Sequence, residues 1–158
     1  MDNTGAERLE SFERDRRHLL AVAFRLLGSE ADAPDVLQEA WIRFARTDVG
    51  ELSNVSAWLT TVVTRLCLDV LRRRRVYLQQ PADIARVAGV SGNTPEEVAL
   101  LTAELTEAFS VLLQKLTPPQ RVALILHEVF GTPFDEVARI LGTTPVSAKS
   151  WPAARASG

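Results

Sequence analysis

The sequence predicts an all-α protein made of two small helical domains joined by a flexible linker. Apolar residues recur at helical spacing in both halves of the chain, and they never alternate with period two for long enough to predict a strand. Between the halves, residues 76–93 lose this pattern and contain the turn-forming runs Gln79-Gln80-Pro81 and Gly89-Val90-Ser91-Gly92. We therefore expect helical domains at residues 6–75 and 94–158 and a linker at 76–93.

The first half contains three amphipathic segments with recognisable ends. The first spans residues 6–27 and is followed by Gly28, a residue that commonly ends helices. The second follows a capping residue, Ser29 or Asp32, and the third begins near Asn54. These signals predict three consecutive helices with short connections.

The second half repeats one helix-start signal, a threonine followed by a proline. The threonine hydroxyl can cap a helix, and proline suits the first helical position, where a backbone N–H would have no partner. Gly131 and Gly142 are expected to end the two middle helices. The signal predicts four helices, beginning at Thr94-Pro95, Thr117-Pro118, Thr132-Pro133 and Thr144-Pro145, with capping-box partners at Glu97, Gln120 and Asp135 and only Ser147 in the fourth.

Residues 134–149 have the pattern of a helix-turn-helix, in which two short helices pack together across a glycine turn. Ala138 is small at the point where the second helix must approach closely. The same pattern fits a plain structural hairpin, so these residues alone leave both DNA binding and a structural role open. The residues expected to face the core are Val137, Ala138, Leu141, Val146 and Ala148, with Gly142 at the turn.

The third predicted helix carries polar and cationic groups beside its apolar stripe. Trp58, Thr61, Arg65 and Arg72 lie on overlapping faces at helical spacing, and the helix ends in the run Arg72-Arg73-Arg74-Arg75. Arginines can hold phosphates, and an aromatic or hydroxyl face can meet unstacked bases. Alternatively, Trp58 belongs to the core and the arginines form a solvated helix end that the helix dipole favours.

Charge and composition limit where the protein acts. The formal net charge is -2, so any DNA contact must be local rather than spread over a basic surface. The N-terminal segment lacks the apolar core of a signal peptide, and no apolar run approaches the roughly 20 residues that span a bilayer. Cys67 is the single cysteine and has no disulfide partner, which suits a reducing compartment. We expect a cytoplasmic protein that does not enter membranes.

The residues that usually carry catalysis do not form a set in this sequence. Cysteine and histidine do not cluster with metal-ligand spacing, and His18 and His127 lie in predicted helices without a nucleophile or carboxylate partner. Both histidines are expected to be structural. We therefore predict a non-enzymatic binding protein that uses no metal and no cofactor.

A series of motifs runs through nearly the whole chain in a fixed order. They are Asp32-Ala33-Pro34-Asp35-Val36-Leu37-Gln38-Glu39-Ala40-Trp41, then Ala57-Trp58-Leu59 leading to Leu68-Asp69 and the arginines, then Leu116-Thr117-Pro118-Pro119-Gln120-Arg121, Phe130-Gly131, and Phe134-Asp135-Glu136-Val137-Ala138-Arg139-Ile140-Leu141-Gly142. This order resembles that of the extracytoplasmic-function sigma factors, the small sigma-70 relatives that retain regions two and four only. Without it, the polar face of Asp35, Gln38 and Glu39 would be an ordinary surface.

The resemblance implies a function and assigns residues to it. A protein of this family binds the clamp helices of the largest catalytic subunit of core RNA polymerase and directs the polymerase to promoter DNA. An anti-sigma factor is a further implied partner. The residues implied to bind core polymerase are Asp35, Gln38, Glu39, Trp41 and Arg43. Those implied to bind the minus-ten element are Trp58, Thr61, Arg65, Arg72, Arg73, Arg74 and Arg75, and those implied to bind the minus-thirty-five element are Thr143, Thr144, Ser147, Lys149 and Ser150.

Two departures from the family pattern matter. Arg65 stands where many members carry asparagine, which resembles a subgroup with an additional C-terminal domain of nuclear-transport-factor-like shape, and the sequence contains no such domain. Pro152 interrupts the expected recognition helix, and because proline inside a helix costs roughly 3 kcal/mol we expect the helix to end near Ser150. The alternative function is therefore a truncated sigma paralogue that binds polymerase or an anti-sigma factor without full promoter recognition.

Overall fold

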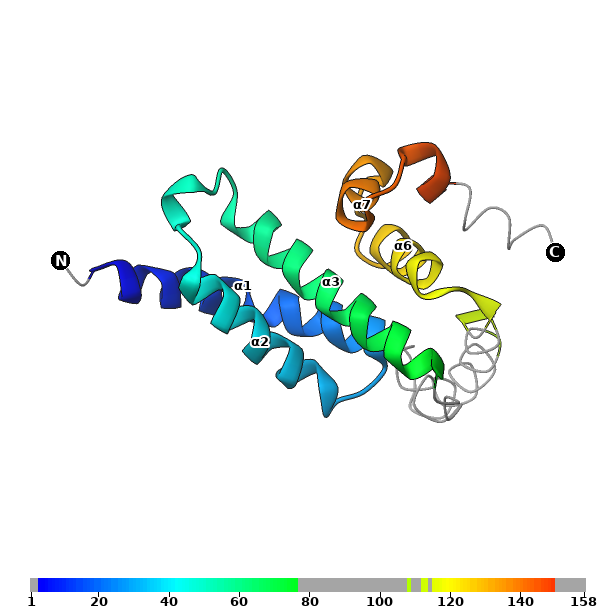
Figure 1. The fold of residues 1–158 in the computed structure, drawn as a ribbon, viewed down its shortest axis with the longest axis horizontal. Coiled ribbons are helices and arrows are strands. Elements are labelled where there is room, and N and C mark those ends of the chain that lie inside the picture. The colour runs from blue at the N-terminus through cyan, green and yellow to red at the C-terminus, as the bar shows by residue number, and fades with distance from the viewer. Residues whose placement is uncertain (1–2, 77–107, 109–111, 114, 150–158) are drawn as a thin grey trace, which may run out of the picture.

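The computed structural model describes residues 3–76, 108, 112–113 and 115–149, and the described part of the chain contains helices and no strand (Figure 1). A further helical turn covers residues 145–149. The all-α prediction is confirmed. The helices are α1 (Asn3–Leu27), α2 (Asp32–Arg46), the 3-10 helix η1 (Val49–Glu51), α3 (Val55–Val76), α6 (Pro118–Glu128) and α7 (Phe134–Leu141).

The first three α-helices lie side by side and bury a shared apolar core (Figure 1). Each contributes residues at helical spacing, because only one stripe of an amphipathic helix can face its neighbours. Almost complete burial of a leucine or phenylalanine side chain contributes about 1.5–3 kcal/mol, so this core dominates the stability of the first half. Its largest fully buried side chains are Leu19, Val22, Leu26, Phe44, Leu59, Val63 and Leu71.

The ends of these helices follow the signals in the sequence. Gly28 has φ 65°, the left-handed conformation that glycine adopts without a steric penalty, and its N–H donates to the carbonyl of Phe24 at 2.7 Å. The Ser29 hydroxyl accepts a hydrogen bond from the N–H of Asp32 at 3.3 Å. The side chain of Asn54 accepts from the N–H of Ala57 at 3.0 Å at the start of α3. Helix α2 itself follows Ala31 and has no side-chain cap, so neither predicted residue is its N-cap, and the Ser29 bond belongs to the turn before it.

Helix α6 begins after a complete capping box. The Thr117 side chain accepts a hydrogen bond from the N–H of Gln120 at 3.4 Å, and the Gln120 side chain accepts one from the N–H of Thr117 at 3.0 Å. The predicted capping box is thus present. Gly131, at φ 65°, ends this helix as expected.

The predicted cap of α7 is wrong. Thr132 makes no side-chain cap with Asp135, and the residue that caps the helix is Pro133, through its backbone alone. Thr132 belongs to the end of α6 instead, because its N–H donates to the carbonyl of Leu126 at 2.9 Å in the turn that Gly131 makes possible. The start predicted at Thr94-Pro95 lies outside the described residues.

The helix-turn-helix core is mostly as predicted, with one clear error. Val137, Ala138 and Ala148 are buried and Gly142 makes the turn at φ 66°, but Val146 is 78% exposed. Residues two apart on a helix point in nearly opposite directions, so Val146 and Ala148 cannot both face the core. Ile140, rather than Leu141, is the fully buried residue at the end of α7, and Leu141 is half-buried.

The two halves of the chain are in contact. Helix α3 packs against both α6 and α7, and α1 packs against α6 (Figure 1). The ring of His18 on α1 meets the ring of Phe130 after α6 edge-on, with 5.7 Å between the ring centroids. Within the described ranges, no helix is long and apolar enough to cross a membrane.

Candidate polymerase and nucleic-acid interfaces

The five residues predicted to bind polymerase all lie on α2, and four of them are exposed. Asp35, Gln38, Glu39 and Arg43 lie on its outer surface, whereas Trp41 is half-buried. Glu39 and Arg43, one helical turn apart, form an ion pair of 3.2 Å. The outer side of α2 is therefore a charged surface with an aromatic ring at its edge.

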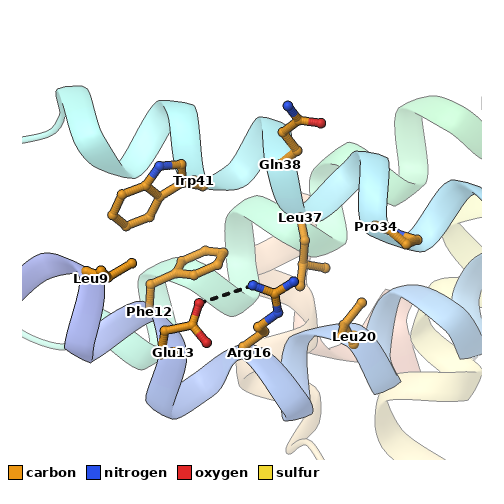
Figure 2. Close-up of a pocket in the computed structure, with 9 residues that line it drawn as sticks. All are labelled: Leu9, Phe12, Glu13, Arg16, Leu20, Pro34, Leu37, Gln38 and Trp41. Carbon is orange, nitrogen blue, oxygen red and sulfur yellow. Dashed lines mark hydrogen bonds and ion pairs between the residues drawn. The ribbon is translucent and has the colours of Figure 1, made fainter.

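A groove of about 350 Å³ runs between α1 and α2 beside this surface. Figure 2 shows Trp41 and Gln38 on the α2 side, and an ion pair between Glu13 and Arg16 on the α1 side. The Trp41 ring packs edge-on against Phe12, at 5.2 Å between centroids, and these rings form part of the groove wall. The full lining is Leu9, Phe12, Glu13, Arg16, Leu20, Pro34, Leu37, Gln38 and Trp41.

Sequence reasoning missed the contribution of α1 to this groove. The apolar stripe of α1 is expected to belong to the core, and most of it is buried there. The one signal is Leu9, an apolar residue near the start of the helix that remains 50% exposed. An amphipathic pattern shows which face is apolar, but it does not show whether a neighbouring helix covers the whole of that face.

Trp58 and Thr61, predicted to bind unstacked bases, lie on α3 in partly buried positions. The Trp58 ring packs against that of Phe44 at 5.8 Å between centroids, so much of it belongs to the core. The Thr61 hydroxyl donates to the carbonyl of Ala57 at 2.9 Å within its own helix. The structure therefore engages each of these two side chains with protein groups.

The predicted DNA-binding arginines have different surroundings. Arg72 and Arg73 are exposed, whereas Arg74 donates to the carboxylate of Asp32 and to the carbonyl of Leu27, the latter at 2.7 Å. The side chain of Arg75 lies outside the described residues. The four consecutive arginines thus occupy at least two different structural environments.

Arg65 lies apart from this run and contacts the second half of the chain. Its Nε donates to the carbonyl of Ile140 at 3.0 Å, and a terminal guanidinium nitrogen lies 3.4 Å from the carbonyl of Arg139. Both acceptors are in the last turn of α7. Arg65 therefore links the helix predicted to read the minus-ten element to the turn of the helix-turn-helix.

Arg121 on α6 is a buried charged residue. The sequence placed it in the motif of residues 116–121 but predicted no role for it. Its side chain is 6% exposed and donates to the carbonyl of Leu113 at 3.4 Å. Burial, and secondarily the positive charge of Arg74, lowers the pKa of this guanidinium. Arg121 therefore helps to hold the start of α6 rather than forming a binding surface.

The residues predicted to read the minus-thirty-five element surround the turn after α7. Thr144 caps the following helical turn, since its hydroxyl accepts from the N–H of Ser147 at 3.2 Å and lies 3.0 Å from the Ser147 hydroxyl. Thr143 is half-buried, Lys149 is exposed, and Ser150 lies outside the described residues. The predicted end of the helix near Ser150 therefore stays a prediction.

Side chains that usually support catalysis are used for packing. His127 Nδ1 lies 3.0 Å from the carbonyl of Thr132, and its ring stacks on Phe134 at 3.8 Å between centroids. Burial raises the pKa of the Cys67 thiol to about 12, which makes it a poor nucleophile. Among the described residues, no three His, Cys, Asp or Glu side chains are grouped so that they could hold a metal ion.

Two parts of the chain match models of known protein families. Residues 12–76 match the model of sigma-70 region 2, and residues 106–151 match that of sigma-70 region 4. The chain is 41% identical over 145 residues to the extracytoplasmic-function RNA polymerase sigma factor SigJ of Mycobacterium tuberculosis (strain ATCC 25618 / H37Rv). The chain belongs to the extracytoplasmic-function sigma factors of the sigma-70 family.

The relatives of this sigma-family chain are longer than it is. The match to SigJ covers 89% of the chain and 46% of SigJ, and a probable sigma factor SigI of the same organism (strain CDC 1551 / Oshkosh) is 36% identical over 132 residues, covering 81% of the chain and 46% of SigI. The crystal structure of SigJ superimposes with a TM-score of 0.61 at 35% identity, covering 94% of the chain and 52% of that structure. The chain thus spans about half the length of these relatives.

The family regions coincide with the helical groups. Region 2 takes in most of α1 together with α2 and α3, and region 4 takes in α6, α7 and the helical turn at residues 145–149. The charged face of α2 and all of the groove lining except Leu9 therefore lie in sigma region 2. The turn that Arg65 contacts lies in sigma region 4.

Proposed function

We propose that this chain acts as a sigma-type initiation factor, which binds core RNA polymerase and directs it to promoters in the cytoplasm. The observation that carries the proposal is the α2 surface, where exposed Asp35, Glu39 and Arg43 adjoin the groove between α1 and α2 within sigma region 2. A charged rim around a partly apolar groove is the usual composition of a protein-binding surface. The protein acts by binding and has no catalytic role, and an anti-sigma protein is a second partner for the same regions.

The DNA contacts divide between the two regions. Arg72 and Arg73 are exposed at the end of α3 and are available for phosphates near the minus-ten element. Trp58 and Thr61 offer the edges that remain exposed on the same helix. In region 4, Lys149 is an exposed cation on the surface predicted to enter the major groove. We assign Arg74 to the stability of region 2 rather than to DNA, because its guanidinium is bonded within the protein.

The test is capture of the full chain by core RNA polymerase. Reversing the charges of Asp35 and Glu39 together, as D35K/E39K, should weaken capture about tenfold or more, because like charges would then face the partner's complementary surface. The helical content should not change, since both side chains are exposed.

A matched control exists on the same domain. Glu10 pairs with Arg14 one turn away, as Glu39 does with Arg43, and both Glu10 and Glu51 are exposed outside the groove. The variant E10K/E51K makes the same change in net charge and should be captured like the unmodified chain. Equal capture of the two double variants would remove the assignment of the α2 face.

A second candidate function is that of an interaction protein, which binds polymerase or an anti-sigma factor without full promoter recognition. It is favoured by the composition of residues 143–149, in which Lys149 is the single cation. The base-reading contacts of a recognition helix need several side chains spread along it. Strong discrimination between cognate and scrambled minus-thirty-five duplexes would exclude the interaction protein, whereas loss of preference for both the minus-ten and the minus-thirty-five element would favour it.

A further inference from the structure

Val146 is the most exposed large apolar residue in the part of the chain that the structure describes, at 78%. The next is Leu9 on α1, at 50%. A single exposed aliphatic side chain is common on a protein surface and by itself needs no explanation. Val146, however, lies within residues 143–149, which follow the turn of the helix-turn-helix in sigma region 4. Its place on this surface, rather than its exposure alone, points to DNA.

The packing of the helical turn at residues 145–149 directs Val146 away from the protein. Ala148 is fully buried, and residues two apart on a helix point in nearly opposite directions. Lys149 is exposed and follows Val146 by three residues, so the two side chains share one face of the turn. A lysine that binds a phosphate fixes the position of a protein on the duplex, and its neighbours on the same face then meet the base edges.

The residues on either side of Val146 hold this turn in place. The Thr144 hydroxyl donates to the Ser147 hydroxyl at 3.0 Å and accepts from the Ser147 N–H at 3.2 Å. Pro145 has no backbone N–H, and it is exposed like Val146. Pro145 and Val146 therefore form a small apolar surface between two hydroxyl-bearing residues that are bonded to each other.

We propose that Val146 reads the 5-methyl group of a thymine in the minus-thirty-five element. Thymine is the base that presents a methyl group in the major groove, and apolar side chains distinguish it there by direct contact. The opening residues of a recognition helix are those that contact base edges. The proposal rests on the proposed sigma function and adds the chemical group that this chain recognises. Burial of one methyl group corresponds to about fourfold in affinity.

The experiment uses the complex of the full chain with core polymerase. This complex first selects its preferred sequence from duplexes randomised over the minus-ten and minus-thirty-five elements. Each thymine of the selected minus-thirty-five element is then replaced by deoxyuridine, which removes the 5-methyl group and keeps every hydrogen-bonding group of the base. At one position the replacement should weaken binding of the unmodified protein about fourfold. In V146A the same replacement should change binding by less than about 1.5-fold, because the contact is already lost.

A matched control exists at the end of α6. Val129 is also an exposed valine, at 43%, and it lies outside residues 143–149. V129A makes the same change in side-chain volume and should keep the fourfold loss on deoxyuridine. V146A should fold like the unmodified chain, since Val146 is exposed and alanine is the better helix former.

The outcomes separate the methyl contact from the sigma function. A selected minus-thirty-five element without thymine, or equal binding of thymine and deoxyuridine duplexes, would overturn the methyl contact alone. The same deoxyuridine penalty in V146A would also overturn it, because another side chain would then contact the methyl group. Weaker capture of V146A by core polymerase, with that penalty unchanged, would make Val146 a protein contact instead. Failure of the complex to select any sequence would refute the sigma function, and the methyl contact with it.

Discussion

Arg74, in the last full turn of α3, donates to the carboxylate of Asp32 at the start of α2 and to the carbonyl of Leu27 at the end of α1. One side chain thus joins the ends of three helices. The carbonyl of Leu27 belongs to the last turn of α1 and needs an external donor, while the carboxylate of Asp32 lies in the first turn of α2, where the helix dipole favours negative charge. This arrangement makes Arg74 a structural residue within a run that otherwise resembles a DNA-binding segment.

Replacing Arg74 should therefore cost stability. We expect R74A to lower the free energy of unfolding by about 2 kcal/mol, because it removes charge-assisted hydrogen bonds from a partly buried site. R73A, which removes an exposed neighbour, should change it by less than about 0.5 kcal/mol. Urea unfolding followed by circular dichroism measures both. Equal stabilities would show that the hydrogen bonds of Arg74 contribute nothing net.

The salt dependence of DNA binding by the holoenzyme should reflect Arg72 and Arg73, which are exposed, rather than Arg74, which is bonded within the protein. Removing one phosphate-binding arginine should reduce the steepness of the plot of log binding constant against log salt concentration by about 0.9. R72A/R73A should therefore reduce this slope by about 1.8 if both arginines touch phosphates. The matched control R14A/R17A removes two exposed arginines of α1 and should leave the slope unchanged. An unchanged slope in R72A/R73A would indicate that these arginines form only a solvated helix end.

The sequence predicted local features better than contacts between distant segments. The helices of the first half and the capping box of Thr117 and Gln120 were predictable because neighbouring residues determine them. Thr132 shows the limit of local patterns. It precedes a proline as the capping threonines do, but because of the turn at Gly131 its N–H is bonded to Leu126 at the end of α6. The hydrogen bond between Arg65 and Ile140 spans 75 positions, and no local pattern contains it.

The two threonines provide a direct test of this distinction. T117A should lower the free energy of unfolding by about 1 kcal/mol, because it removes the side-chain acceptor for the N–H of Gln120. T132A should have a much smaller effect, since Thr132 engages its neighbours through its backbone. Thermal unfolding of the two variants under the same conditions compares them. A larger destabilisation in T132A would contradict the assignment of the cap.

Burial of Cys67 should make stability depend on pH in the alkaline range. The folded thiol has a pKa of about 12, against an ordinary value of 9.0. The unfolded chain therefore releases this proton first, so the contribution of Cys67 to stability is complete below about pH 9 and declines as the pH rises toward 12. At about pH 10.5 the decline should be about 2 kcal/mol relative to C67A, whose own pH dependence reports the other titrating groups. Parallel pH profiles for the two proteins would show that the thiol is not desolvated in solution.

The composition of the minus-thirty-five surface predicts weak base discrimination. Each good bidentate contact to a base contributes about 1–3 kcal/mol of discrimination, so specific recognition needs several of them. The hydroxyl of Thr144 is engaged in capping with Ser147, and Thr143 is half-buried. Lys149 is a single point charge, which favours phosphate over a particular base. We therefore expect the full chain, in complex with core polymerase, to prefer a cognate over a scrambled minus-thirty-five sequence by less than about tenfold.

Two variants separate phosphate binding from base reading at this surface. K149A should weaken binding to cognate and scrambled duplexes equally and reduce the salt slope by about 0.9. W151L/P152A removes the predicted helix break and should lengthen the helix, yet it should restore only part of the affinity because it adds no arginine. Titration of the holoenzyme against both duplexes at fixed salt gives the ratio. Discrimination of about 10³-fold or more by the unmodified protein would show that the short helix suffices, and would favour the initiation factor over the interaction protein.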